Sequence, residues 1–545
     1  MYVFENPVLQ RELLVNLRTP RAFVLLFLYQ ALLATLVYFA WPQDVRLDLT
    51  GNPEAAKSLV DLFFLGQYML ASLMAPSFAA SAITGEKERK TYEMLLASPL
   101  RPGAIVLGKL VASLAHLAVL IFASLPIVML CLPLGGVSLW ELLAAYLALI
   151  VSVITFGAIS VACSSYFNRT AASLVVSYLL ILPLALTAVL FWYWSSGLGH
   201  LRLYMTLTVV PGVGVAICIA LFANTSARML HPPDMGSEGK EVVDLEQEAK
   251  EAVGLVIQRD QFPDKLFAPG KRDFLLPDGS NPVYDKEIRS EIFSQGTLML
   301  RVVIQVSMLL AIPLMAACLY IAPKYAPWYI SYVVLFNMLV GPVFSAGAVT
   351  SERERQTLDL LLTTTITPWQ ILWGKLIAGL RVSSVLTTFL LWPVLLACLM
   401  VSSYWTNLLA VFGYIGIVLV TCLTTAVLAL FCSVVFRKTS VSLMTSYLVI
   451  IVLFCAPLAA RFFAEVFFAN HQATPYVVHA GLTSPFAATF AVPLDVEIAT
   501  ESSGVAAQGN MQLLLNYSLF SVGLITGLVL TMMWLFRTRW RVAQQ

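Results

Sequence analysis

Twelve apolar runs, each long enough to cross a lipid bilayer, dominate this chain and restrict the folds open to it. A hydrocarbon core of about 30 Å needs about 20 apolar residues of helix, because a helix pairs its own backbone groups without water. The runs lie at roughly 22–41, 60–83, 104–132, 140–166, 171–194, 203–227, 299–322, 328–350, 376–401, 407–435, 441–463 and 511–536. Only 12% of the residues are charged, against about 25% in soluble domains. The sequence therefore predicts an all-α polytopic membrane protein with about 12 transmembrane helices.

The two halves of the sequence repeat each other in register. Asn6-Pro7-Val8 near the start has a counterpart in Asn281-Pro282-Val283. Further matching pairs are Glu12 and Glu287, Gln30 and Gln305, Pro76 and Pro342, Gly108-Lys109-Leu110 and Gly374-Lys375-Leu376, and Cys163-Ser164 and Cys432-Ser433. We therefore predict two six-helix repeats, residues 1–228 and 281–545, joined by a polar linker at 229–280.

The positions of the basic residues predict the orientation in the membrane. With the N-terminus in the cytoplasm and six spans in each half, five of the 33 Lys and Arg residues fall outside: Arg46, Lys57, Arg202, Lys324 and Arg461. The rest lie on the cytoplasmic side. An even number of spans in each half makes the two repeats parallel, and it places both termini and the linker in the cytoplasm.

A densely charged stretch between the second and third runs of each half is the most unusual local feature. Thr84–Leu96 and Thr350–Leu362 share the pattern Thr-x-Glu-basic-Glu-Arg-x-Thr. We expect each to form one short helix of about 12 residues, or roughly 18 Å, with Ser351 and Glu354 as a capping box in the second copy. The candidate contact residues for a soluble partner are Glu86, Glu88, Arg89, Thr91, Glu352, Glu354, Arg355 and Thr357. The alternative is a solvated loop whose charges only follow topology, and the matching second copy disfavours it.

The segments Thr84 to Lys109 and Thr350 to Lys375 resemble the signature of the ABC-2 family, the permease subunits of type-2 ABC exporters. The resemblance implies that each charged helix is a coupling helix, which seats in a cleft of a cytoplasmic ATPase, and that the amphipathic residues 5–20 form a connecting helix. Because that family usually has six spans in a chain, this chain resembles two such permeases fused.

The resemblance also implies partners and a location. Two ATPase subunits on separate chains would bind ATP and Mg²⁺, so this chain itself would bind no cofactor and catalyse no reaction. The expected surroundings are membrane lipid and an export substrate that the sequence does not identify, in the bacterial cytoplasmic (inner) membrane. A net charge of +2 gives no indication of a nucleic-acid partner.

One segment imitates a nucleotide-binding loop. Gly103 to Lys109 satisfies G-x-x-x-x-G-K, but Leu110 follows where a Ser or Thr would hold Mg²⁺, and no strand precedes it. The second copy has Trp369 in place of the first glycine. We therefore predict no nucleotide site here, and expect Lys109 and Lys375 to reach water from the cytoplasmic interface.

Two prolines in the second span of each half are candidate hinges. Pro76 and Pro342 lie about ten residues before the charged glutamates, and each removes a backbone hydrogen bond and should kink its helix. The kink could carry motion of the charged helix into the membrane. A static kink that serves packing is an equal alternative.

Three polar side chains fall inside apolar runs. Gln30 and Gln305 are expected to be buried at equivalent depth, where they could line a transport pathway or only bond to a neighbouring helix. His116 could change protonation, or remain neutral and bonded to another helix. For all three residues the structural alternative is favoured.

The outer segment 464–510 is far longer than its counterpart in the first half. The family resemblance implies short re-entrant helices there. His471 and His479 are weak candidates for metal binding, no H-E-x-x-H motif occurs, and all eight cysteines lie in apolar runs. We therefore predict no metal site.

The sequence is consistent with three functions. The favoured one is the transmembrane permease of an ATP-driven exporter. An ion-coupled secondary transporter is the alternative, but no acidic residue lies deep in a span, because Asp61 and Glu141 are at outer helix ends. A membrane anchor that signals through an associated ATPase is a third possibility.

Overall fold

The protein is described from a computed structural model that divides into two compact units. The described residues are 7–17, 27, 30–31, 53–129, 138–167, 170–194, 200–230, 281–288, 305–306, 309–321, 323–354, 356–437, 439–458, 483–492 and 505–539. The units are Met1–Val243 (unit 1) and Asp244–Gln545 (unit 2). The boundary falls inside the predicted linker 229–280, of which residues 231–280 lie outside the described part.

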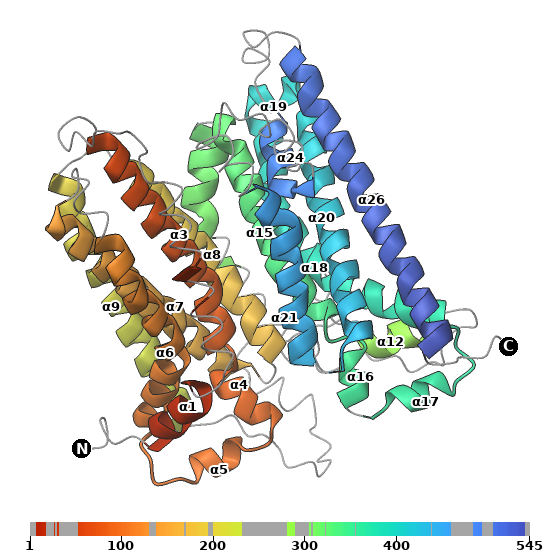
Figure 1. Ribbon diagram of the computed structural model, residues 1–545, viewed down its shortest axis with the longest axis horizontal. Coiled ribbons are helices and arrows are strands. Elements are labelled where there is room, and N and C mark those ends of the chain that lie inside the picture. The colour runs from red at the N-terminus through yellow and green to blue at the C-terminus, as the bar shows by residue number, and fades with distance from the viewer. Residues whose placement is uncertain are drawn as a thin grey trace, which may run out of the picture. The chain divides into compact units, whose positions relative to one another are not determined.

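Unit 1 is a bundle of long helices arranged around α7 (Figure 1). Its helices are α1 (Pro7–Leu17), α3 (Pro53–Ala79), α4 (Ser81–Glu88), α5 (Tyr92–Leu96), α6 (Pro102–Met129), α7 (Leu139–Tyr166), α8 (Thr170–Trp194) and α9 (His200–Leu230). Helix α7 packs against α3, α6, α8 and α9. It buries Leu149, Val153 and Phe156 at helical spacing. The core of this unit therefore lies along α7.

Local sequence determines where α7 begins. The Ser138 hydroxyl accepts a hydrogen bond from the Glu141 amide at 3.2 Å, and the Glu141 carboxylate accepts one from the Ser138 amide at 2.9 Å. This capping box satisfies two amides that the first helical turn leaves unpaired. Glu141 thus has a capping role at the end of its helix.

Unit 2 is a second bundle, arranged around α20 (Figure 1). Its α-helices are α12 (Pro282–Ile288), α15 (Ala326–Ser345), α16 (Thr350–Glu354), α17 (Leu358–Leu362), α18 (Pro368–Met400), α19 (Ser402–Thr406), α20 (Leu408–Val435), α21 (Thr439–Ile450), α24 (Pro485–Ala491) and α26 (Val505–Arg539). Shorter elements are the π-helices η3 (Ala316–Ile321) and η5 (Ile451–Cys455) and the 3-10 helix η4 (Pro323–Tyr325). Helix α20 packs against α15, α18, α21, α24 and α26.

Ten helices in the described part of the chain are long and apolar enough to cross a membrane. They correspond to ten of the twelve predicted runs. Of the run 22–41, only residues 27, 30 and 31 are described. In the run 299–322, the described helix Leu309–Ile321 is shorter than a full span. Two of the ten spans, Phe63–Glu88 and Ala326–Glu354, continue into α4 and α16.

The described part of segment 464–510 contains a short buried helix, α24. It packs against α15, α20 and α26. Tyr414 of α20 donates a hydrogen bond to the carbonyl of Val492 at 2.6 Å, and Thr483 donates to the carbonyl of Leu453 at 3.1 Å. These bonds fix both ends of α24, so that the helix is part of the core of unit 2. His471 and His479 lie outside the described residues.

Candidate functional site

The charged stretch of each unit forms two short helices separated by a sharp turn, so the prediction of one continuous helix was wrong. In unit 1 the helices are α4 and α5, and in unit 2 they are α16 and α17. The turn residues Lys90 and Gln356 have φ of 58° and 57°. Such left-handed backbone costs a residue with a side chain about 1–2 kcal/mol, and it ends the helix as a Schellman motif.

The hydrogen bonds of that motif are the same in both units. The Thr91 amide donates to the Glu86 carbonyl at 2.9 Å, and the Thr357 amide donates to the Glu352 carbonyl at 2.9 Å. Each bond spans five residues, as the motif requires. The reversal brings the threonine side chain back onto the glutamate, which the one-helix prediction could not anticipate.

The predicted capping box of the second copy was also wrong. Ser351 lies inside α16, and its amide donates to the carbonyl of Gly347 at 3.0 Å. Thr84 lies inside α4, where its hydroxyl donates to the carbonyl of Ala80 at 2.8 Å. Both helices begin earlier than expected because they follow α3 and α15 after only a short turn.

A serine from the central helix caps each charged helix instead. In unit 1 the Ser164 hydroxyl of α7 accepts bonds from the amides of Ile83 and Thr84 at 2.9 and 2.8 Å. In unit 2 the Ser433 hydroxyl of α20 accepts bonds from the amides of Val349 and Thr350 at 2.8 and 3.0 Å. Sequence reasoning missed this role, although the repeat had already paired the two serines.

A buried lysine joins α4 to two other helices in unit 1. The Lys109 ammonium of α6 lies 3.0 Å from a carboxylate oxygen of Glu86 on α4 and 3.4 Å from one of Glu12 on α1. Thr91 donates its hydroxyl hydrogen to the other carboxylate oxygen of Glu86. We call Glu12, Glu86, Thr91 and Lys109 the lysine cluster of unit 1.

The matching residues of unit 2 form the same arrangement. Lys375 of α18 pairs with Glu287 of α12 and, at 3.3 Å, with Glu352 of α16. Thr357 donates its hydroxyl hydrogen to the other oxygen of Glu352. Lys286 adds a second ammonium 2.8 Å from Glu352. Residues 287, 352, 357 and 375 are the lysine cluster of unit 2.

The two cluster lysines do not reach water, which corrects the expectation from the sequence. Lys109 is only 5% exposed and Lys375 only 2%. A buried ammonium is tolerated only where charged partners replace its hydration. The two carboxylates around each lysine supply that replacement, so the ammonium groups stay inside.

Further charged side chains of α4 and α16 bond to the neighbouring helix ends. The Glu88 carboxylate accepts the Thr170 amide at the start of α8 at 2.8 Å, and Glu354 accepts the Thr439 amide at the start of α21 at 2.9 Å. A carboxylate at a helix N-terminus is stabilised by the helix dipole. Lys87 donates to the carbonyl of Phe167 at 3.0 Å. These charges therefore hold the short helices onto their own unit.

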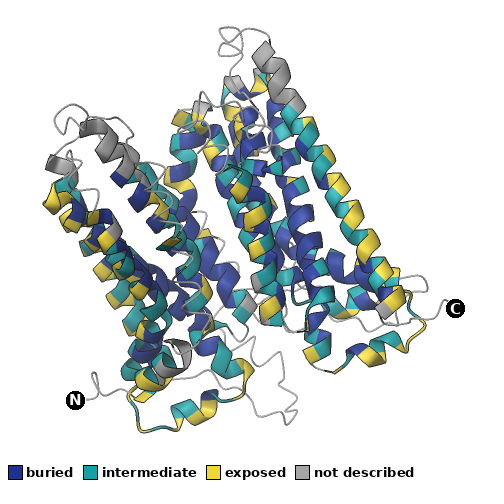
Figure 2. Ribbon diagram, viewed as in Figure 1, coloured by how far each residue is buried: buried dark blue, intermediate teal, exposed yellow. Residues whose placement is uncertain are grey.

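Besides Ser81, Glu88 and Glu354, the exposed residues lie on α5 and α17 and on the turns before them (Figure 2). Met94 is 77% exposed, and Leu360, its counterpart, is 69% exposed. Next to them are the exposed acidic residues Glu93 and Asp359. Arg89 is exposed, and Arg355 lies outside the described residues. Each unit thus presents one large apolar side chain beside one carboxylate.

The opposite side of α5 is anchored in the core. Tyr92 is buried against Ile83, Val106 and Met229, and the Lys87 ammonium lies 5.5 Å from the centre of its ring. Burial raises the pKa of the Tyr92 phenol, and the positive charge of Arg228 offsets part of this rise. The phenol is therefore neutral at physiological pH. Helix α5 thus has one side buried in the core, with Tyr92, and one exposed side, with Met94, which we call its free side.

Comparison with protein families identifies the chain. The model of the family described as ABC-2 family transporter protein matches residues 7–199 and 233–536, which include both lysine clusters and both exposed helices. The chain belongs to the ABC-2 transporter family. No curated protein and no solved structure matches it. As an ABC-2 transporter component it is an integral multi-pass membrane protein with no catalytic activity of its own, and membership implies association with ATPase subunits.

The candidate hinges of this ABC-2 protein lie one turn before helix ends. Pro76 is inside α3 and Pro342 is inside α15. Near each proline a tyrosine hydroxyl bonds a carbonyl of the disturbed turn, from Tyr178 to Leu73 at 2.8 Å and from Tyr447 to Leu339 at 2.6 Å. Proline removes the amide that would donate to the carbonyl four residues earlier, which is Ser72 or Met338. The tyrosines of α8 and α21 bond the next carbonyl of the same turn.

The two candidate pathway glutamines of the ABC-2 chain differ in their surroundings. Gln30 is half-buried and donates a hydrogen bond to the carbonyl of Ala123 on α6. Gln305 is exposed, so the expectation of equivalent burial was wrong. His116 stacks on Phe78, with ring centres 6.0 Å apart. A pathway role for Gln30 and Gln305 stays a prediction.

Proposed function

We propose that this ABC-2 protein is the permease subunit of an ATP-driven exporter, built from two fused six-span repeats and served by two separate ATPase subunits. The observation that carries the proposal is the recurrence of the lysine cluster, residue for residue, in units 1 and 2. Each copy connects a short charged helix with a membrane-spanning helix and with α1 or α12.

The contact surface for each ATPase is the free side of α5 or α17. Met94 and Leu360 are apolar side chains held away from the core of their units, and exposed apolar side chains beside charges are typical of protein contacts. This assignment changes the role predicted for Glu86 and Glu352. They are internal links behind the contact surface, and Glu88 and Glu354 fasten the same helices from another side.

The lysine cluster carries motion from this surface into the membrane. Lys109 belongs to α6 and Lys375 to α18, and both helices start beside the short helices and continue as spans. Breaking a buried ion pair by removing one partner costs about 3–5 kcal/mol, so each short helix and its span move together. The turns at Pro76 and Pro342 are the places where α3 and α15 bend during this movement.

In this proposal the ATPase subunits, and not the permease, bind the nucleotide. The stretch Gly103 to Lys109, which imitates a phosphate loop, is the first part of helix α6. Its lysine is already bound to Glu86 and Glu12. Both features support ATP and Mg²⁺ binding by the ATPases, and the end of the helices that carries α5 and α17 is then the cytoplasmic end, in a bacterial inner membrane.

The first test concerns the contact surface. We expect Met94→Asp combined with Leu360→Asp to abolish recovery of the ATPase subunits with the detergent-solubilised permease, because a charge replaces each apolar contact. Both positions are exposed, so the permease itself should fold. Arg101→Ala, an exposed change at the same end of α6, is the matched control and should retain the ATPases. Full recovery with the double variant would contradict the contact assignment.

The second arm concerns transmission. Glu86→Ala with Glu352→Ala should retain the ATPases but separate their ATP hydrolysis from movement of the spans. Spin labels at the exposed positions Ala97 and Val119 of unit 1 measure this. On addition of ATP the distance distribution should stay narrow in the parent and broaden in the variant. An unchanged distribution in the variant would show that Glu86 transmits nothing.

A further inference from the structure

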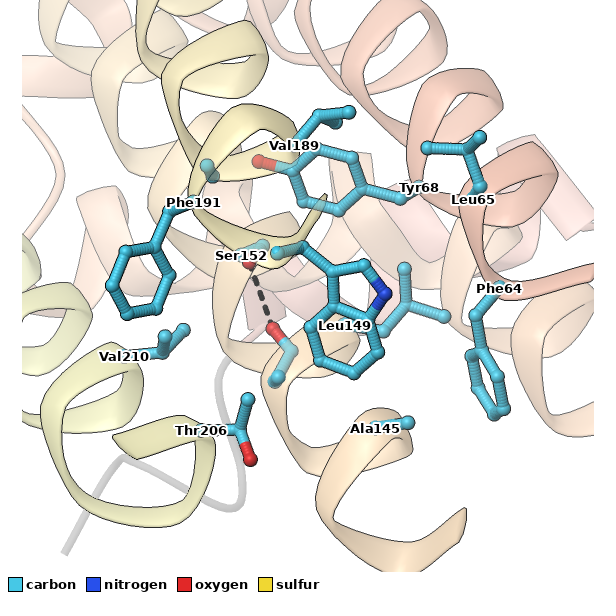
Figure 3. A pocket seen from close by; sticks show the side chains of 13 residues that line it. Phe64, Leu65, Tyr68, Ala145, Leu149, Ser152, Val189, Phe191, Thr206 and Val210 are labelled. Atoms are coloured by element: carbon cyan, nitrogen blue, oxygen red, sulfur yellow. Dashed lines mark hydrogen bonds between the residues drawn. The ribbon is translucent and has the colours of Figure 1, made fainter. Parts of the chain in front are cut away.

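A cavity of about 110 Å³ lies between α3, α7, α8 and α9 in unit 1, away from the charged helices (Figure 3). Its wall includes Phe64 and Tyr68 from α3, Leu149 from α7 and Val210 from α9, and Figure 3 shows these side chains around one space. A cavity of about 10–15 Å³ on the same measure is enough to hold one water molecule. The cavity therefore has room for several heavy atoms of a ligand.

The wall offers almost only carbon to such a ligand. Two of its three hydroxyl groups are occupied by their own helices, since Ser152 donates to the carbonyl of Ala148 at 2.8 Å (Figure 3) and Thr206 donates to that of Leu203 at 2.9 Å. The Tyr68 phenol and the Trp192 indole are the other polar groups of the wall. Apolar cavities of this kind stay dry and take up hydrocarbon, because water finds too few polar partners in them. The ligand group that fits is therefore a hydrocarbon chain.

The cavity is situated where a lipid chain could enter it. Phe64, Trp192 and Thr206 lie within a few residues of the ends of three spans, Phe63–Glu88, Ala172–Trp192 and Leu203–Met229. This is the end of α3 opposite to α4. The lining residue Phe191 is 41% exposed, and the lining residue Ala188 is also exposed. The cavity thus opens at the surface of unit 1, beside Ala188 and Phe191 of α8.

Aromatic side chains mark the membrane boundary at the same level. Trp140 is 75% exposed at the start of α7, and Tyr204 is 65% exposed near the start of α9. Exposed Trp and Tyr gather at the headgroup level of a bilayer. A phospholipid whose headgroup lies at that level can place one of its chains in the cavity.

We propose that this cavity is a binding site for an acyl chain of a membrane phospholipid, taken from the leaflet at the end of unit 1 opposite to α5. None of its lining residues belongs to α5, so the site is separate from the proposed ATPase contact. Leu149 is its most diagnostic residue, because it is only 3% exposed and lies on the inner wall, where chains of the surrounding bilayer do not reach.

Photo-crosslinking tests the proposal on the full chain. The protein is reconstituted in phosphatidylcholine vesicles that contain a phosphatidylcholine with a diazirine on one acyl chain, illuminated, and digested for peptide mapping. The expected result is label on α7 near Leu149, in addition to label on the exposed side of α9 near Ile219. Label on α9 without label near Leu149 would overturn the proposal.

Three variants make the test specific. Ala145→Phe fills the cavity from α7, and Ala188→Phe blocks its mouth from an exposed position where folding is unaffected. Both should lose the label near Leu149 and keep the label on α9. Ala220→Phe, an equal change at an exposed position of α9, should keep both. Undiminished label near Leu149 in the two cavity variants, or label there from a diazirine alkane but not from the phospholipid, would overturn the assignment.

Discussion

At the scale of single residues, the setting of Lys109 and Lys375 depends on contacts that sequence position alone does not reveal. A lysine near the end of a membrane span normally extends its ammonium to water. Here Glu12 and Glu86 approach Lys109 from two other helices, and Glu287 and Glu352 do the same for Lys375. Whether each ammonium can stay charged inside the protein then depends on its two carboxylate partners.

Removal of the ammonium should be costly. We expect Lys109→Met to lower the stability of unit 1 by about 3–5 kcal/mol, because Glu86 and Glu12 would remain close together without a counter-charge. Thermal unfolding in a fixed detergent measures the effect. Adding Glu86→Gln and Glu12→Gln should recover much of the loss, since neutral side chains need no counter-charge. A Lys109→Met protein as stable as the exposed control Arg101→Met would disprove the role of the cluster.

At the scale of elements, α4 and α16 are held by other helices more than by their own sequence. Helices this short are marginal in isolation. Ser164 of α7 and Ser433 of α20 bond their first amides, while Lys109 and Lys375 bond their glutamates. The turns at Lys90 and Gln356 then change the chain direction, so that α5 does not continue the axis of α4 and α17 does not continue that of α16. Sequence periodicity detects none of these contacts, because every partner is distant along the chain.

Loss of the serine cap should loosen α4 selectively. Ser164→Ala leaves the buried amides of Ile83 and Thr84 without their acceptor, which costs about 1–3 kcal/mol. Hydrogen–deuterium exchange should become faster at these two amides. The matched control is Ser160→Ala, one turn earlier in α7, whose hydroxyl donates to the carbonyl of Phe156 in the same helix. Equal exchange in the two variants would show that Ser164 is not the cap.

At the scale of the whole molecule, the two proposed contact surfaces are similar but unequal. Lys90 and Met94 in unit 1 stand where unit 2 has Gln356 and Leu360. Four long helices of each unit that follow these surfaces correspond to predicted runs. The predicted total of twelve spans and the parallel order of the repeats stay predictions, because most of the run 22–41 lies outside the described residues.

Two surfaces on one chain predict a stoichiometry. We expect native mass spectrometry of the complex to show two ATPase subunits for each permease chain. With Met94→Asp alone or Leu360→Asp alone, one ATPase subunit should stay bound to each permease chain, because each change removes a single contact surface. The exposed control Arg101→Ala should leave two. Loss of both subunits with either single variant would contradict independent binding.

The sequence by itself determined the class of protein, the approximate spans and the positions of the two charged stretches. The reason is that the lengths of apolar runs and the positions of charges are read directly from the order of residues. The family resemblance of these stretches was confirmed. Only the tertiary structure decided which charges face inward. Glu86 and Glu352 were predicted to contact a partner, yet each pairs with a lysine 23 residues further along the chain. An ion pair of this kind depends on how α4 and α16 turn against α6 and α18, and spacing along the chain does not contain that rotation.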